Sequence, residues 1–108
     1  MSRLQPYRVR IPTHVIQLMD VASRITLFLV GNNGPLSFVF QDRLQNKYKT
    51  TIGAEIKCSC SPNKNDHCIH SIYVFLKIFK VSAENPMIWQ CSYLDNELQD
   101  LVNGKHTV

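Results

Sequence analysis

The sequence has no long hydrophobic run. Its longest apolar stretch, residues 25–30, is six residues long and includes a threonine, whereas a transmembrane helix needs about 20 apolar residues. The early arginines Arg3, Arg8 and Arg10 are not followed by the apolar segment of a secretory signal. We therefore expect an intracellular chain, in the cytoplasm or nucleus, that makes no contact with membranes.

Cysteine and glycine are scarce, with four of each among 108 residues. Four cysteines are too few for a small disulfide scaffold, and clustered cysteines in a reducing compartment more often bind metal. The sequence shows no paired carboxylates and no glycine-rich phosphate loop. It therefore predicts neither catalysis by this chain alone nor a small-molecule substrate.

The remaining composition is that of a globular domain. Apolar residues make up 44% and charged residues 19% of the chain, and its length fits one domain. The net charge is +4, but residues 1–54 hold seven basic and two acidic residues, whereas residues 55–108 hold five and six. The basic half suits nucleic acid or an acidic partner, although an ordinary solvated surface explains it more simply.

The first third of the chain predicts a helix after an extended start. Residues 1–12 carry prolines among arginines and are expected to form a lead-in. Thr13 stands where a helix cap is expected, and apolar residues recur at helical spacing over residues 13–29. The segment 31–35, GNNGP, would end this helix. Residues 25–30 are rich in β-formers, however, so that a strand there is the alternative.

A small antiparallel meander is expected next. Apolar and polar residues alternate over residues 36–41 and again over residues 47–52, which is the period of a strand. A tight turn at residues 53–54 then leads into a short third strand at residues 55–57.

The last third predicts helices. The residues Ile72, Phe75, Leu76 and Phe79 share one helical face after His70. Asn85 before Pro86 marks a new start. Ser92 is expected to cap a final helix that ends at Gly104 and buries Leu94, Leu98, Leu101 and Val102.

Three cysteines and one histidine form a compact cluster, Cys58-Ser-Cys60 and Cys68-Ile-His70. Seven residues separate the two pairs, and proline, asparagine and aspartate among them predict a loop. Two ligand pairs joined by a loop are typical of tetrahedral zinc, and three thiolates with one imidazole leave no open position. The sequence therefore predicts one structural Zn²⁺ held by these four residues.

The one-residue gap within each pair constrains where the residues lie. Side chains at i and i+2 share a face in a strand, so Cys58 and Cys60 are expected to project together as the third strand ends. In a helix the same spacing places side chains about 200° apart. Cys68 is therefore expected at or before a helix start, with His70 in the first turn. Lys57 and Lys64 are close enough in sequence to offset the negative charge of the centre.

Other residues compete for these roles. His67 adjoins Cys68 and is the alternative fourth ligand, although adjacent ligands strain a tetrahedral site. Simple burial of Cys58 and Cys60 as free thiols is the other interpretation. Cys91 and Trp89 are expected in the core. His14 and His106 are distant in sequence from the cluster.

The spacing C-x-C, a gap, then C-x-H resembles the SWIM zinc finger. The resemblance covers residues 36–80 and implies a ββα zinc module with Cys58, Cys60, Cys68 and His70 as ligands. The expected fold class is therefore α+β: a small zinc-stabilised domain at residues 13–104, with a short antiparallel meander, an N-terminal helix and C-terminal helices.

The flanks, with VSAENPMIW at residues 81–89, are similar to the SWIM region of SWIM–RING ubiquitin ligases and of the related mitogen-activated kinase kinase kinase. This similarity implies binding of a protein partner or ubiquitination substrate. A RING needs about eight further Cys/His ligands, and only Cys91 and His106 follow His70. We therefore expect an interaction module that is not a ligase by itself.

Nucleic-acid binding is the alternative function, because SWIM fingers also occur with transposases and plant transcription regulators. The candidate contacts are Tyr7, Arg8, Arg10, Lys47, Tyr48 and Lys49. Against it, the segment after His70 is apolar and lacks polar side chains to contact base edges.

Overall fold

The computed structural model describes residues 7–60 and 66–104. In chain order its elements are α1 (Thr13–Arg24), β1 (Phe28–Asn32), β2 (Ser37–Gln41), β3 (Lys47–Ile52), β4 (Ile56–Cys58), α2 (Ile69–Tyr73), the π-helical turn η1 (Val74–Ile78), the 3₁₀ helix η2 (Pro86–Trp89) and α3 (Asp95–Val102). None of the helices in this part of the chain is both long and apolar enough to span a bilayer.

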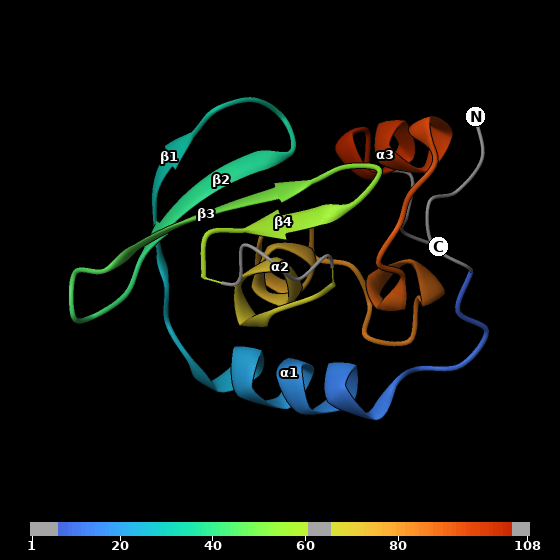
Figure 1. The fold of residues 1–108 in the computed structure, drawn as a ribbon, viewed down its shortest axis with the longest axis horizontal. Helices are drawn as coiled ribbons and strands as arrows, with labels where there is room; N and C mark the ends of the chain where they lie inside the picture. Colours follow the sequence, from blue (N-terminus) through green and yellow to red (C-terminus); the bar gives the residue numbers. More distant parts are fainter. Residues whose placement is uncertain (1–6, 61–65, 105–108) are drawn as a thin grey trace.

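The four strands form one antiparallel sheet in the order β1-β2-β3-β4. Helix α2 lies against β3 and β4, and α1 packs on the opposite side of α2 (Figure 1). Helix α3 lies beside the turn that joins β3 to β4 (Figure 1). The predicted α+β class is thus confirmed, with α2 between the sheet and α1.

Strand alternation decides which face of the sheet is buried. Phe38 and Phe40 of β2 are buried, as are Thr50 and Ile52 of β3, whereas their neighbours along each strand are more exposed. The Phe40 ring meets the Tyr73 ring of α2 edge-on, with centroids 5.6 Å apart. The expected alternation over residues 36–41 and 47–52 is confirmed, and it turns the apolar face towards the helices.

The expectation of a helix over residues 13–29 is wrong for its last part, residues 25–29. Helix α1 ends at Arg24, and Phe28–Asn32 is strand β1, as the alternative for this segment foresaw. The backbone of β1 pairs with β2, and this long-range pairing outweighs the helical spacing of the apolar residues. The segment 31–35 therefore ends a strand and turns a hairpin, with Gly34 at φ 131°.

Three expected boundaries also shift. Thr13 is the first residue of α1, and Pro12 occupies the cap position without a side-chain cap. The short third strand of the meander is β4, one residue later than expected. Ser92 is buried and does not cap α3, since Leu94 takes that place and its N–H donates to Glu97 Oε1 at 2.8 Å.

The helix that contains His70 changes from α-helical to π-helical hydrogen bonding at Val74. Helix α2 continues directly into η1, where the N–H of Phe79 donates to the carbonyl of Val74, five residues back, at 3.0 Å. The extra residue in this turn rotates the following side chains. Ile72, Val74 and Phe75 lie in the core, whereas Leu76 and Phe79 of the expected face, which lie within and just after the π turn, are only partly buried.

Candidate metal centre

The predicted ligands come from two segments that meet beside the sheet. Cys58 is the last residue of β4, and Cys60 follows in a turn. Cys68 is the cap residue of α2, and His70 lies in the first turn of that helix. The placement expected for Cys68 and His70 is confirmed. Cys60 reaches the cluster from a turn rather than from the strand, because β4 ends two residues earlier.

The four side chains converge on one point. Their ligand atoms all lie within 4.8 Å of one another. His70 Nδ1 is 3.5 Å from Cys58 Sγ and 3.7 Å from Cys68 Sγ. Zinc–sulfur bonds of about 2.3 Å and zinc–nitrogen bonds of about 2.0–2.1 Å place sulfur and nitrogen about 3.6 Å apart on a tetrahedral edge. The donor set and its spacing therefore fit one structural Zn²⁺, with Nδ1 as the histidine donor.

Strand β3 supports this cluster from the sheet side. The Thr50 hydroxyl is buried and donates to Cys58 Sγ at 3.2 Å. The Tyr48 ring stacks on the His70 imidazole, with centroids 4.2 Å apart and planes inclined by 26°. Ser59 Oγ accepts from the Lys49 N–H at 3.0 Å and holds the turn between the two cysteines against β3. The positions of the donor atoms are thus fixed by groups outside the metal centre.

Cys58 and Cys68 affect each other's pKa. The hydrogen bond between the two sulfurs raises the pKa of Cys58, and burial adds to that rise. The same hydrogen bond lowers the pKa of Cys68, as do contacts from His70 and from Ser71. Zinc binds cysteine as the thiolate, so zinc binding must displace the thiol protons of the cluster.

His67, the alternative ligand, is occupied elsewhere. It is fully buried, its Nε2–H donates to the Gln90 carbonyl at 2.6 Å, and its Nδ1 lies 2.9 Å from Ser71 Oγ. Burial lowers its pKa to about 4, so it is neutral at physiological pH. Its role is to tie the start of α2 to the segment after η2. Sequence reasoning weighed His67 only as a ligand, because nothing local marks its distant partner Gln90.

A second clamp joins the N-terminal segment to the metal loop. The Arg8 guanidinium donates to both carboxylate oxygens of Asp66, at 3.1 and 2.7 Å, and to the Trp89 carbonyl at 3.0 Å. Burial pushes the pKa of Asp66 upward, but hydrogen bonds from Arg8 and from the His67 N–H lower it overall. Asp66 is thus an ionised anchor two residues before Cys68. This contact was not expected from the sequence.

Among the described residues, the other candidates do not belong to the cluster. Cys91 is buried, as expected, and Trp89 is partly buried against the core. His14 Nε2 lies 3.2 Å from an Asp66 carboxylate oxygen. Lys57 is exposed on β4. Lys64 and His106 lie outside the described residues.

The candidate nucleic-acid contacts are partly committed to the fold. Arg8 is held by Asp66, and Tyr48 is stacked on His70. Arg10, Lys47 and Lys49 are exposed. The structure therefore provides fewer free contacts for phosphates than the sequence suggested.

Two kinds of known protein are similar to this chain. It is 30% identical over 97 residues to mitogen-activated protein kinase kinase kinase 1 of Rattus norvegicus and of Homo sapiens, and the match covers 89% of this chain and 6% of the relative. It is 27% identical over 93 residues to the E3 ubiquitin-protein ligase Zswim2 of Mus musculus, covering 82% and 15%. No protein-family profile and no solved structure matches.

A match over 89% of the chain necessarily includes residues 58–70, where the metal ligands converge. The chain carries a SWIM-type zinc finger. The SWIM finger here comprises the end of β4, the turn after it and the start of α2, supported by β3. Because the chain spans only a small part of each relative, their whole-protein activities do not transfer to it directly.

Proposed function

We propose that this chain is a zinc-stabilised protein-interaction module in which Cys58, Cys60, Cys68 and His70 bind the metal. It acts as the substrate- or partner-binding part of a ubiquitin-ligase-type protein, in the cytoplasm or nucleus, and is not catalytic alone. The working unit is residues 13–104, with the finger core at residues 36–80.

The observation that carries this proposal is the closed donor set. All four tetrahedral positions are supplied by the protein, so a bound zinc has no site for water or substrate and serves to hold the fold. A metal that joins the sheet to α2 supplies folding energy and fixes the surface around it. This supports binding rather than hydrolysis.

The ligase context rests on the relatives. One of them is named an E3 ubiquitin-protein ligase, and the other is a protein kinase kinase kinase. Both act on other proteins, so a module that they share with this chain is best explained by recognition of protein. The partner of this chain need not be theirs, because identity is only 27–30%.

Capture of partners with matched variants tests the proposal. The tagged chain, a Cys60→Ser variant and a Cys91→Ala variant are expressed in cells, and co-purifying proteins are quantified after nuclease treatment. We expect the wild type and Cys91→Ala to enrich the same proteins and Cys60→Ser to lose them. A purified partner should then be ubiquitinated when the chain is fused to an active RING, with E1, E2 and ubiquitin.

Two results would contradict it. If the zinc-loaded chain enriches no protein over Cys60→Ser, it is not a zinc-dependent interaction module. If enrichment disappears with nuclease, and if the purified chain binds a short oligodeoxythymidylate with an affinity that falls steeply as salt rises, the nucleic-acid alternative replaces it.

A further inference from the structure

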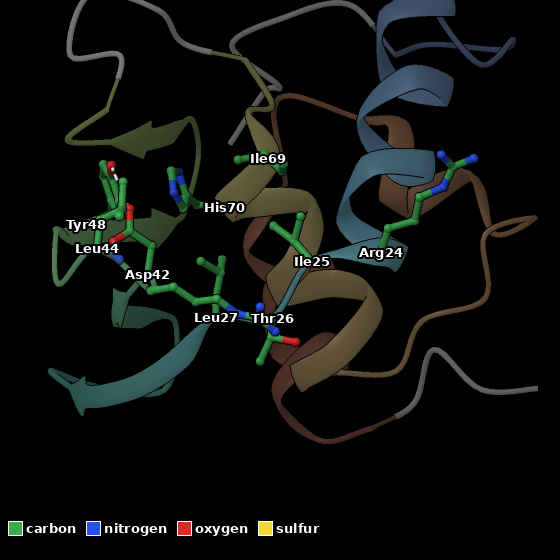
Figure 2. A pocket seen from close by; sticks show the side chains of 10 residues that line it. Arg24, Ile25, Thr26, Leu27, Asp42, Leu44, Tyr48, Ile69 and His70 are labelled. Carbon is green, nitrogen blue, oxygen red and sulfur yellow. Dashed lines mark hydrogen bonds between the residues drawn. The ribbon is translucent and has the colours of Figure 1, made fainter.

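A cavity of about 540 Å³ adjoins the metal centre. Figure 2 shows it between the β2–β3 hairpin, with Leu44 and Tyr48, and the segment that joins α1 to β1, with Ile25 and Leu27. The His70 ring contributes to the wall, so the zinc site and the cavity share a residue. Its volume falls in the range of ordinary ligand pockets.

The wall of this cavity is mostly apolar. Its apolar side chains are those of Ile25, Leu27, Leu44 and Ile69, beside the Tyr48 and His70 rings. Leu44 is 82% exposed at the tip of the hairpin. Phe28, Leu29 and Val30 come directly after the cavity residue Leu27 in the sequence. Each is about half exposed on β1, an edge strand of the sheet. Exposed apolar side chains are therefore present on β1 as well as in the cavity, which favours a peptide-sized occupant over a small molecule.

The hairpin turn that presents Leu44 is held rigidly. Asp42 Oδ1 accepts from the N–H groups of Leu44 and of Asn46, both at 2.9 Å, and Oδ2 accepts from the Tyr48 hydroxyl at 3.3 Å. The turn therefore holds the large apolar side chain of Leu44 in solvent, where it does not contribute to the core. The entropy cost of binding there is low because the loop is already ordered.

The charged side chains that line the cavity are those of Arg24, Asp42 and Arg43. The Asp42 carboxylate is occupied by the hydrogen bonds of its own turn. Arg24 is paired with Asp20 at 3.0 Å, and Figure 2 shows its side chain turned away from the cavity. Arg43 makes no ion pair or hydrogen bond with any side chain in the described ranges 7–60 and 66–104. A partner with a carboxylate next to its apolar group could therefore pair with Arg43.

We propose that this cavity binds a short acidic peptide. A large apolar side chain of the peptide enters between Leu44, Leu27 and Ile69, and a neighbouring Asp or Glu pairs with Arg43. This inference rests on the proposed function, since it names the class of partner for the interaction module. A nucleic acid fits less well, because it needs several phosphate contacts and, among residues 7–60 and 66–104, Arg43 is the one cation at the cavity without an ion-pair partner.

The first step of the test is to find a peptide that binds. The zinc-loaded chain is used to select binders from a random heptapeptide phage library. We expect enriched peptides to combine one large apolar residue with adjacent Asp or Glu. The most enriched peptide, labelled with fluorescein, is then titrated by anisotropy against the wild type, Leu44→Ser and Arg43→Glu. Each cavity variant is expected to bind about tenfold more weakly.

The controls are exposed residues outside the cavity. Val9→Ser matches the loss of an exposed apolar side chain, and Arg10→Glu matches the charge reversal. Both should bind within about twofold of the wild type, because neither residue lines the cavity. Thermal unfolding and zinc content must stay unchanged in all four variants, since none of these residues is buried.

The outcomes separate this inference from the proposed function. Peptides that bind equally well to Leu44→Ser and Arg43→Glu, or that lack acidic residues, overturn the cavity assignment but leave the interaction module intact. If no peptide is enriched and the labelled oligodeoxythymidylate binds in a Leu44-dependent manner, the cavity serves nucleic acid. If the library and the oligonucleotide both fail on zinc-loaded protein, the cavity is not a docking site.

Discussion

The Tyr48 ring stacks on the imidazole of His70, with their centroids 4.2 Å apart. Tyr48 belongs to β3 and His70 to α2, so this contact joins the sheet to the helix at the zinc ligand itself. It fixes the plane of the imidazole and thereby directs Nδ1 towards the sulfurs of Cys58 and Cys68. The aromatic residue is thus part of the support of the metal centre.

Removal of the Tyr48 ring should weaken zinc binding, whereas removal of its hydroxyl should not. We expect Tyr48→Ala to lower the Tm by about 4–8 °C and to lose zinc to a competing chelator sooner than the wild type. Tyr48→Phe keeps the stack and loses only a 3.3 Å hydrogen bond to Asp42. Equal chelator resistance of Tyr48→Ala and the wild type would show that stacking has no role in metal retention.

Loss of one zinc ligand should unfold the region around the metal. Zinc binding to structural sites contributes on the order of 10 kcal/mol, which is comparable to the whole stability of a small domain. We expect Cys60→Ser, or chelation of the wild type, to abolish the single bound zinc in native mass spectrometry and to reduce the helical circular dichroism signal. Cys91→Ala serves as the control that keeps zinc. Unchanged melting and zinc content in Cys60→Ser would refute the ligand assignment.

The Arg8–Asp66 clamp should contribute measurably to stability. The Arg8 guanidinium makes three hydrogen bonds, two of them to one carboxylate, and we expect Arg8→Ala to cost about 1–2 kcal/mol in urea unfolding. Arg8→Lys should recover only part of this, because lysine cannot donate in the same bidentate manner. Arg24→Ala breaks an exposed pair with Asp20 and should cost less than about 0.5 kcal/mol.

Acid should destabilise the domain through His67. Burial lowers its pKa from 6.5 to about 4, so between these values the unfolded chain binds a proton and the folded chain does not. The stabilisation is complete above pH 6.5 and is lost as the pH falls towards 4, by about 3 kcal/mol in total.

Comparison with a His67→Gln variant isolates this contribution. Urea unfolding is measured from pH 7 to pH 4 with excess zinc, and the wild type minus variant difference cancels the acid sensitivity shared by the thiolates. The variant should be less stable than the wild type near pH 7, and its free energy of unfolding should change less with pH. Parallel pH profiles of the two proteins would show that His67 does not titrate in this range.

Much of the sheet and of the metal cluster could be predicted from local sequence. Strands β2 and β3 alternate because one face is buried, and that pattern is visible in the side chains themselves. The Cys68 and His70 placement follows from helix geometry alone. Both predictions depend on residues no more than a few positions apart.

The features that could not be predicted depend on distant parts of the chain. The apolar residues of 25–30 satisfy helix and strand patterns equally, and only pairing of β1 with β2 decides between them. The hydrogen bond from His67 to Gln90 and the clamp from Arg8 to Asp66 span 23 and 58 residues. The π turn at Val74–Ile78 leaves no sequence signature.

The metal centre is accessible to solvent on the side of Cys60. Cys58, Cys68 and His70 are buried, whereas Cys60 is exposed in the turn after β4. Reagents from solvent therefore meet one sulfur before the others, and we expect alkylation and metal exchange to begin at that sulfur.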